Sequence, residues 1–586
     1  MVTNSLCNMK EKKSSIVRQS WSQLLLVIGI ILVGNLISSF LFTRVDLTNE
    51  KRYTLSAETR ELLKNVDDIV YFRIFLEGEF PAGFKRLKRE TKELLDEFRA
   101  YNKNIAYEFI NPSASENQQE RNATYQLLVQ QGLQPTNLQV KTKSGLEQQV
   151  IFPGALASYR NNEIAIELLD AQMNIPPEAV LNNSIENLEF KFASAIHKIT
   201  RLKKPSIAFI EGQGELNDQE TFDLTKTLNE NYHVDRIRIQ GSLNALVNRT
   251  LIDSVSQKWE IIPKYAAIII AKPDSMFSGK DRFIIDQYLM YGGKILWFLD
   301  PVLASMDSIS GSENTVAIEK KLDIQSQLFT YGVRLNNDLI MDLSAASIPI
   351  RTGQVGNQPQ IEFFPWYYFP IVTPITKHPI GKNLNAIKTQ FVSSIDTLTT
   401  KNVKKTVLLS TSPYSRTEQV PALISLSILR EQPDPRQYTT PPQVIAVLLE
   451  GNFLSDFRNR IPPEIMNDKG IGFKENSVST AMLVVSDGDL IINQFQQGKP
   501  LPLGYDQYTR ETFGNKDFVL NAINYLTEGP GLISIRSREM KLRLLDKAKV
   551  NESKMIWQFF NVLAPVFIII LTGLLLISLR KRKYAQ

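Results

Sequence analysis

Cysteine and histidine are scarce in this sequence, whose 586 residues include one cysteine and three histidines. A single cysteine, Cys7, excludes a disulfide framework within the chain and a C-x-x-C redox motif. The histidines are His197, His233 and His378. Single histidines so far apart do not form a metal-ligand pattern, and a structural role is more common for such residues. We therefore expect no metal site and no cofactor.

Catalytic motifs are missing as well. The sequence contains no H-E-x-x-H, no G-x-S-x-G and no G-x-x-x-x-G-K-[ST]. The first two are typical of zinc proteases and serine hydrolases, and the third binds the phosphates of nucleotides. Because Cys7 lies near the N-terminus, the rest of the chain has no cysteine nucleophile either. These absences argue against an enzyme, and we expect no catalytic residues.

Positive charge is concentrated at the two ends of the chain. The sequence has 67 Lys and Arg against 61 Asp and Glu, a net charge of +6. Residues 1–20 carry +3, residues 580–586 carry +4, and residues 21–579 carry −1. A basic patch on a folded domain would favour a nucleic-acid partner. With the charge confined to two short tails, the pI of about 8.9 gives no support for nucleic-acid binding.

Each basic tail adjoins a long uncharged apolar run. The runs extend from Trp21 to Phe42 and from Met555 to Leu579. A helix needs roughly 20 apolar residues to cross a bilayer, and both runs are long enough. A signal peptide has a shorter apolar region, of ~7–15 residues, followed by a small-residue cleavage site. We therefore predict transmembrane helices at 21–42 and 555–579, with a cleaved signal peptide and a buried core helix as the respective alternatives.

The tails also predict the orientation of these helices. Lys and Arg flanking a span favour the cytoplasmic side. Tails 1–20 and 580–586 are then both cytoplasmic, and residues 43–554 lie outside, in the periplasm of a bacterium. Three residues inside the spans, Asn35, Asn561 and Pro565, either face other helices or mark local irregularity. The predicted localisation is the bacterial inner (cytoplasmic) membrane.

Between the spans, residues 44–204 read as a small α/β domain. Periodicity predicts strands at 68–76, 105–110, 137–142, 148–152 and 163–169, and helices at 83–101, 115–131 and 185–199. The strand–helix order is that of a thioredoxin-like domain. Without a C-x-x-C motif the redox chemistry of that fold is excluded. We interpret this segment as a scaffold or binding domain.

Residues 205–535 read as a larger α/β domain, followed by a juxtamembrane segment at 536–554. Apolar strands at 206–210, 265–271 and 294–299 alternate with helices at 219–231 and 279–291, which predicts a parallel, doubly wound sheet. Further strands are predicted at 234–239, 335–341, 406–409, 444–449 and 482–485, and a helix at 516–526. The pattern between 344 and 442 is irregular and indicates insertions or a subdomain. The fold class is thus α/β, anchored by two helices.

A rim of loops is expected at the carboxyl ends of these strands, where open α/β sheets bind ligands. Its candidate binding residues are Glu211, Gly212, Gly214, Glu215, Asp300, Asp487, Gly488 and Asp489. Glycines at such positions let the backbone approach a ligand closely. Carboxylates and glycines are also ordinary turn residues, which is the simpler interpretation. The aromatic segment Phe363–Pro370 is either an exposed partner patch or a hydrophobic flap over the core.

Several segments carry a resemblance to a known family. They are KRYTLS just after the first span, the EGQGE turn, and the segments at 291–301, 331–342, 484–491 and 514–526. Together with the two spans, they resemble the gliding-motility-associated substrate-binding components of ABC transporters, in the auxiliary family of uncharacterised ABC-type transport systems. The resemblance covers nearly the whole chain, and its motifs are structural.

The resemblance implies a non-enzymatic periplasmic subunit that binds a substrate or partner and works with a separate permease and a cytoplasmic ATPase. It also implies a part in gliding or in secretion of the gliding machinery, and an amidotransferase-like α/β domain without the catalytic cysteine. Two alternatives stay open. One is an envelope hydrolase or sugar-binding enzyme that uses the carboxylates of the rim, and the other is a passive envelope scaffold.

Overall fold

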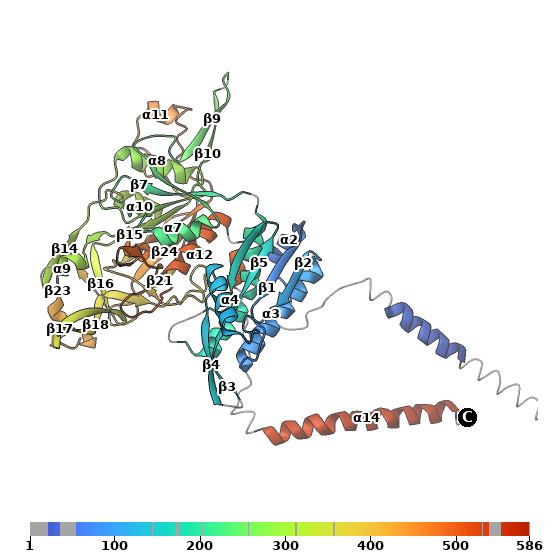
Figure 1. Ribbon diagram of the computed structural model, residues 1–586. Helices are drawn as coiled ribbons and strands as arrows, with labels where there is room; N and C mark the ends of the chain where they lie inside the picture. The colour runs from blue at the N-terminus through green and yellow to red at the C-terminus, as the bar shows by residue number, and fades with distance from the viewer. Residues whose placement is uncertain are drawn as a thin grey trace, which may run out of the picture. The chain divides into compact units, whose positions relative to one another are not determined.

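The computed structural model describes residues 21–35, 54–142, 145–170, 175–201, 203–255, 257–310, 313–355, 358–529, 531–537 and 553–584 (Figure 1). The chain divides into two compact units, and each is described by itself. One unit contains both apolar segments, Met1–Thr54 and Met540–Gln586, and the other is Leu55–Glu539.

The apolar segments are helical where they are described. Helix α14 (Lys554–Tyr584) is continuous through Pro565. Its stretch Lys554–Leu579 has 26 residues and is long and apolar enough to cross a membrane. At the N-terminal end, Trp21–Asn35 is a shorter apolar helix. Residues 36–42, which complete the first predicted span, lie outside the described residues.

The smaller α/β domain contains a four-stranded sheet in the order β2-β1-β5-β6. Strands β1 and β2 are parallel, whereas β5 is antiparallel to both β1 and β6. The strands are β1 (Val70–Ile74), β2 (Ile105–Phe109), β5 (Gly154–Tyr159) and β6 (Asn162–Glu167). The helices are α2 (Ala57–Lys64), α3 (Ala82–Tyr101), α4 (Gln118–Gln130), α5 (Pro177–Glu186) and α6 (Leu188–Thr200). A separate hairpin consists of β3 (Thr136–Thr142) and β4 (Gly145–Ile151).

Helices cover both faces of this sheet, and successive side chains of one strand pack against different helices. In β5, Ala155 and Ala157 belong to the core that includes residues of α3 and α6. Leu156 between them belongs to a second cluster with Leu128 of α4. The predicted strands and helices are present, but β5 was not anticipated. Its sequence GALASY is rich in small residues with low strand propensity, and only its pairing with β1 and β6 defines it.

The larger α/β domain contains a seven-stranded sheet in the order β21-β24-β25-β12-β11-β7-β8. Five neighbouring strands, from β25 to β8, are parallel, as expected from the sequence. Strands β24 and β21 extend the sheet in antiparallel orientation. The strands are β7 (Ser206–Glu211), β8 (His233–Arg238), β11 (Ala267–Ala271), β12 (Ile295–Phe298), β21 (Val403–Ser410), β24 (Val444–Gly451) and β25 (Thr480–Val485).

Helices cover both faces of this sheet too. Ile269 of β11 packs in one core with residues of α7 (Phe222–Asn229) and α12 (Asn515–Glu528). Its neighbours Ile268 and Ile270 pack in another with residues of α8 (Gly279–Met290) and α10 (Gln325–Tyr331). A strand buried on both faces requires a continuous apolar run, which is why AIIIA could be recognised from the sequence.

The irregular region is a β-rich insertion with its own core. Within it lies the long hairpin β17 (Ala345–Val355) and β18 (Gln358–Val372). The same core also takes in strands that precede residue 344: β16 (Asp338–Asp342), which pairs with β22 (Ser415–Gln419), and the sheet of β13 (Val302–Leu303), β14 (Asn314–Glu319) and β23 (Ala422–Ser425). The aromatic segment is part of β18, where Trp366 and Tyr368 are buried in this core and Phe363 is exposed. Most of the segment is therefore core, and only its beginning faces solvent.

Short elements complete the larger unit. They are β9 (Val247–Asp253), β10 (Lys258–Pro263), β13 (Val302–Leu303), α9 (Met306–Ser310), β14 (Asn314–Glu319), β15 (Val333–Leu335), β19 (Ile387–Lys388), β20 (Ile395–Thr397), β23 (Ala422–Ser425), α11 (Pro463–Asn467), β26 (Phe495–Gln496) and β27 (Lys499–Pro500).

Two substitutions in β18 test whether the aromatic segment is structural. Trp366 is 0% exposed and Phe363 is 50% exposed. We expect Trp366→Ala to lower the free energy of unfolding by about 3–5 kcal/mol, because it leaves a large cavity. Phe363→Ala is the matched control, and it should cost about 1 kcal/mol or less. Urea unfolding of the full chain in detergent, followed by circular dichroism, measures both. Equal losses would contradict this assignment.

Candidate functional site

The predicted rim lies at the carboxyl ends of the parallel strands. Strand β8 lies on one side of β7, and β11 lies on the other. The loops after β7 and β11 therefore flank the topological switch point, where open α/β sheets form a binding crevice. The loops after β12 and β25 follow along the same edge.

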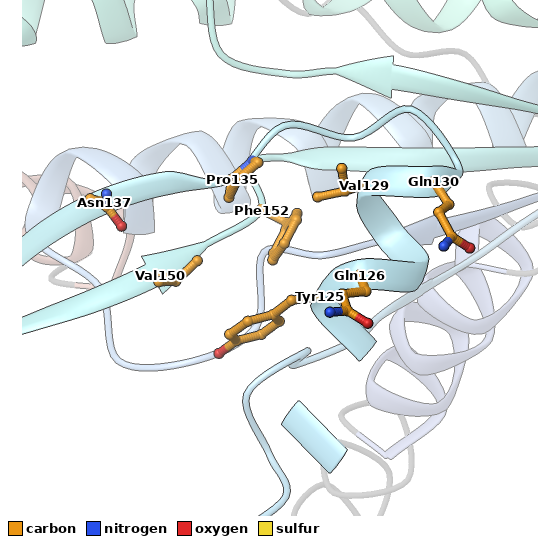
Figure 2. Close-up of a pocket in the computed structure, with 8 residues that line it drawn as sticks. All are labelled: Tyr125, Gln126, Val129, Gln130, Pro135, Asn137, Val150 and Phe152. Carbon is orange, nitrogen blue, oxygen red and sulfur yellow. The ribbon is translucent and has the colours of Figure 1, made fainter. Parts of the chain in front are cut away.

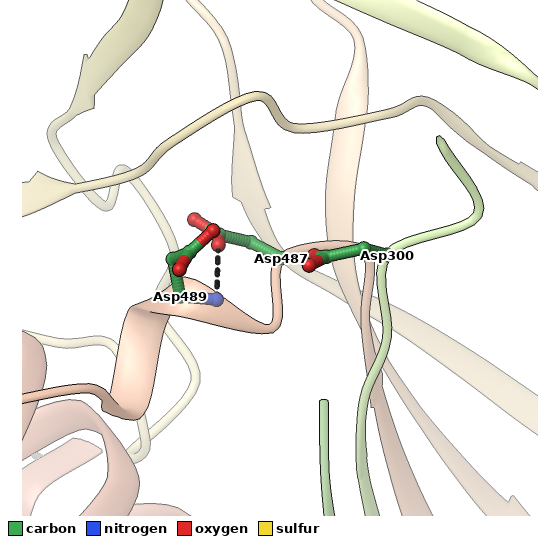
Figure 3. A group of neighbouring side chains, drawn as sticks. All are labelled: Asp300, Asp487 and Asp489. Carbon is green, nitrogen blue, oxygen red and sulfur yellow. Dashed lines mark hydrogen bonds between the residues drawn. The ribbon is translucent and has the colours of Figure 1, made fainter. Parts of the chain in front are cut away.

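Three of the predicted residues come together at this edge. Ligand oxygens of Asp300, Asp487 and Asp489 all lie within 4.8 Å of one another (Figure 3). The backbone N–H of Asp489 donates to Asp487 Oδ1 at 2.8 Å, and that of Gly488 donates to Asp300 Oδ1 at 2.6 Å. We name Asp300, Asp487 and Asp489 the aspartate cluster.

A lysine missed by the sequence analysis completes the cluster. Lys272 directly follows β11, and its Nζ lies 2.5 Å from Asp489 Oδ1 and 3.4 Å from Asp300 Oδ2. Its φ of 52° is in the left-handed region, which is uncommon for a residue other than glycine. Gly488 makes room for it, because a Cβ at this position would lie 2.5 Å from Lys272 Cγ.

Burial and mutual repulsion set the electrostatics of the cluster. Burial, together with the charges of Asp489 and Asp300, raises the pKa of Asp487 well above its usual value. Burial and Asp300 raise the pKa of Asp489 to about 6, and Lys272 opposes this rise. Burial alone would lower the pKa of Lys272, but Asp489 and Asp300 outweigh it and the net shift is upward. A second lysine, Lys320, is 8% exposed, and burial lowers its pKa.

Three converging carboxylates could hold a divalent cation. Here the ammonium group of Lys272 provides the positive charge, since it contacts two of the three carboxylates directly. Asp300 Oδ1 and both oxygens of Asp487 accept backbone hydrogen bonds, including one from the N–H of Gln390 to Asp487 Oδ2 at 3.0 Å. The arrangement is a buried ion-pair network that joins the ends of β11, β12 and β25.

The other half of the rim also engages its own chain. Glu211 Oε1 accepts a hydrogen bond from Arg236 at 2.9 Å, and Glu215 Oε2 accepts one from the backbone N–H of Gln213 at 2.7 Å. Burial raises the pKa of Glu215. Gly214 has a φ of 74°, where another residue would be strained, and a Cβ there would lie 1.8 Å from Asp274 Oδ1 and displace that side chain. Gly212 has open space around it.

These contacts bear on the hydrolase alternative, which requires two carboxylates within reach of a substrate. The carboxylates of the aspartate cluster are close enough to one another for such a reaction. However, Asp487 and Asp300 are buried, and their oxygens already accept hydrogen bonds from the protein itself. Lys272 could not be assigned a role from the sequence, because its partner Asp489 lies 217 residues away. The one signal was a lone charged residue directly after an apolar strand.

An open hollow of about 430 Å³ lies in the smaller α/β domain (Figure 2). It is lined by Tyr125, Gln126, Val129, Gln130, Pro135, Asn137, Val150 and Phe152. The walls are mostly apolar and carry no charged side chain. A neutral group would fit this hollow better than a charged one.

Removing the charge of Lys272 tests the ion-pair network. We expect Lys272→Met to lower the free energy of unfolding by about 3–5 kcal/mol, because it leaves buried carboxylates without a counter-charge. The loss should be smaller at pH 5 than at pH 8. A carboxyl group whose pKa is higher in the folded than in the unfolded state takes up a proton on folding, so the free energy of unfolding falls as the pH rises through that range. Lys272 lowers the pKa of Asp489, so its removal raises that pKa further.

Lys280→Met, at an exposed lysine, is the matched control and should leave the urea midpoint unchanged. Combining Lys272→Met with Asp300→Asn and Asp489→Asn should recover part of the loss. A cost of less than about 1 kcal/mol for Lys272→Met would show that the lysine does not neutralise the cluster.

Comparisons were made with domain families, curated proteins and solved structures. Residues 49–158 match a domain of unknown function. A search of curated proteins finds no match. Among solved structures, the mmIFT52 N-terminal domain is 15% identical with a TM-score of 0.30, covering 55% of this chain and 98% of its own. A ThuA-like protein from Parabacteroides merdae is 11% identical with a TM-score of 0.24, covering 56% and 91%.

The larger domain identifies the family. Residues 204–522 match the family described as "ABC-type uncharacterized transport system". This segment contains the whole seven-stranded sheet, the aspartate cluster and the β-rich insertion. Because the match spans more than half of the chain, the protein belongs to this auxiliary family of ABC-type transport systems.

Proposed function

We propose that the protein is a non-enzymatic, membrane-anchored accessory subunit of an ABC transporter, which works with a separate permease and a cytoplasmic ATPase. The match of residues 204–522 to the auxiliary family carries this proposal. An apolar C-terminal helix long enough to cross a bilayer supports the membrane anchor. The internally paired aspartate cluster supports a structural role for the residues that a hydrolase would use.

The proposal includes a topology with two spans. The basic tails favour cytoplasmic positions for both termini, so the large unit would be periplasmic and the anchor would lie in the inner membrane. The sheet order β2-β1-β5-β6, with only β1 and β2 parallel, supports a thioredoxin-like assignment for the smaller domain. Such a domain without cysteine would serve as a binding surface.

Coupling follows from this topology. Nucleotide-driven motion of the permease would reach the periplasmic domains through the spans and through segments 43–52 and 536–554. The bound species would be a substrate or an envelope partner, and gliding motility is the process that the family resemblance of the sequence implies. Glu211, Gly212, Gly214, Glu215, Asp300, Asp487, Gly488 and Asp489 remain the candidate binding edge, and Gly212 in it is exposed with open space around it.

Affinity purification tests the partnership. A tagged full chain, solubilised from native membranes in a mild detergent, should enrich one permease and one ATPase, as measured by quantitative mass spectrometry. A chain in which α14 is replaced by an unrelated single-span helix is the matched control, and it should lose most of this enrichment. Recovery of neither transporter component with the native chain would contradict the proposal.

Cysteine labelling tests the topology. The native chain has only Cys7, and Val255 is 93% exposed on the large unit. In spheroplasts, a membrane-impermeant maleimide should label Val255→Cys in a Cys7→Ser background and leave native Cys7 unlabelled. Both sites should react after the membrane is opened. Labelling of Cys7 in sealed spheroplasts would overturn the predicted orientation.

A further inference from the structure

The sheet β13-β14-β23 has an apolar face that nothing in the described part of the chain covers. Leu303 and Ile318 are cross-strand partners, and so are Val316 and Leu423. Partners directly opposite each other lie on the same face, as do residues two apart on one strand. These four side chains are 52%, 47%, 55% and 59% exposed, respectively. We name this face the apolar sheet face.

The opposite face of the same sheet is an ordinary core surface. Val302, Ala317, Ala422 and Ile424 alternate with the exposed residues and are buried in the core of the insertion. An antiparallel sheet with one solvated face normally alternates between apolar and polar side chains. Val316-Ala317-Ile318 and Ala422-Leu423-Ile424 are instead continuous apolar runs, which are typical of strands covered on both sides.

The position of the face in the insertion leaves it open to a partner. Figure 1 shows β14 and β23 at an outer margin of the ribbon. Strand β14 is the central strand of its sheet, so its outward residues Val316 and Ile318 are flanked by β13 and β23. An apolar sheet face of this kind can accept a second sheet stacked about 10 Å away.

We propose that the apolar sheet face is an interface between two copies of this chain, stacked sheet on sheet. The face carries no charged side chain, so an isologous contact, which places the patch against itself, brings no like charges together. Its exposed apolar area is on the order of 400 Å², within the range of the largest patch on a typical monomer. A standard interface buries ~800 Å² per partner, so the face supplies the apolar centre and leaves the remainder to a polar rim.

Polar residues suited to that rim border the face. Asn314 and Ser425 are cross-strand partners at one end of β14. Glu313 and Arg430 form an exposed ion pair at 3.3 Å beside them. A residue of each sign on both copies allows the same pairing across a two-fold axis. This inference does not depend on the transporter function proposed above.

Mass photometry and light scattering of the full chain in nanodiscs test the interface. We expect the native protein to be dimeric at micromolar concentration, and Val316→Glu and Leu423→Glu to weaken the dimer at least tenfold. Val255→Glu, at an exposed apolar residue outside this sheet, is the matched control and should remain dimeric. Unchanged melting temperatures of the variants would show that they fold.

Cross-linking separates this face from contacts between the membrane helices. In a Cys7→Ser background, Leu423→Cys should form a covalent dimer with a short bis-maleimide, and Val255→Cys should not. A monomeric native protein, dimers unaffected by both glutamate variants, or a Leu423→Cys that does not cross-link would each overturn the proposal. Loss of a transporter component from a monomeric protein on Leu423→Glu would assign the face to that component instead.

Discussion

The buried ion pair between Lys272 and the aspartate cluster is the interaction on which the larger domain depends. It joins the ends of three neighbouring strands, β11, β12 and β25, through one ammonium group. Carboxylates at this depth cost several kcal/mol unless a counter-charge and hydrogen bonds accompany them. The left-handed backbone of Lys272 and the missing side chain of Gly488 both serve to bring the ammonium group into contact. The local backbone geometry therefore accommodates the ion pair.

This interaction also changes what the sheet can do. An open α/β sheet offers its crevice at the carboxyl ends of the strands, beside the switch point. In this chain Lys272 is paired with the aspartate cluster, Glu215 is bonded to the backbone of its own loop, and Asp274 occupies the space beside Gly214. The architecture of a ligand-binding sheet is present, while its edge is used for internal contacts. The exposed backbone at Gly212 is a part of this edge that stays open to a partner.

Local sequence patterns were sufficient to predict elements that are buried evenly or that end at a clear stop signal. Strand β11 is buried on both faces and helix α8 ends before Gly292-Gly293, so both could be predicted nearly to their limits. Strand β5 could not, because its small residues favour no particular structure and its identity comes from its neighbours. The same holds for the cluster. Asp300 and Asp489 were placed on the correct edge, but their pairing with Lys272 depends on contacts far apart in the sequence.

Two strands of this chain, β11 and β14, contain continuous apolar runs but differ in what covers them. The run AIIIA of β11 is apolar throughout because helices cover both faces of its sheet within one chain. The run Val316–Ile318 of β14 has the same character, yet only Ala317 is buried in a core. Exposing the other two side chains to water is unfavourable in proportion to their area. Covering this face would remove that cost, and because the face is uncharged, a second copy could cover it without bringing like charges together.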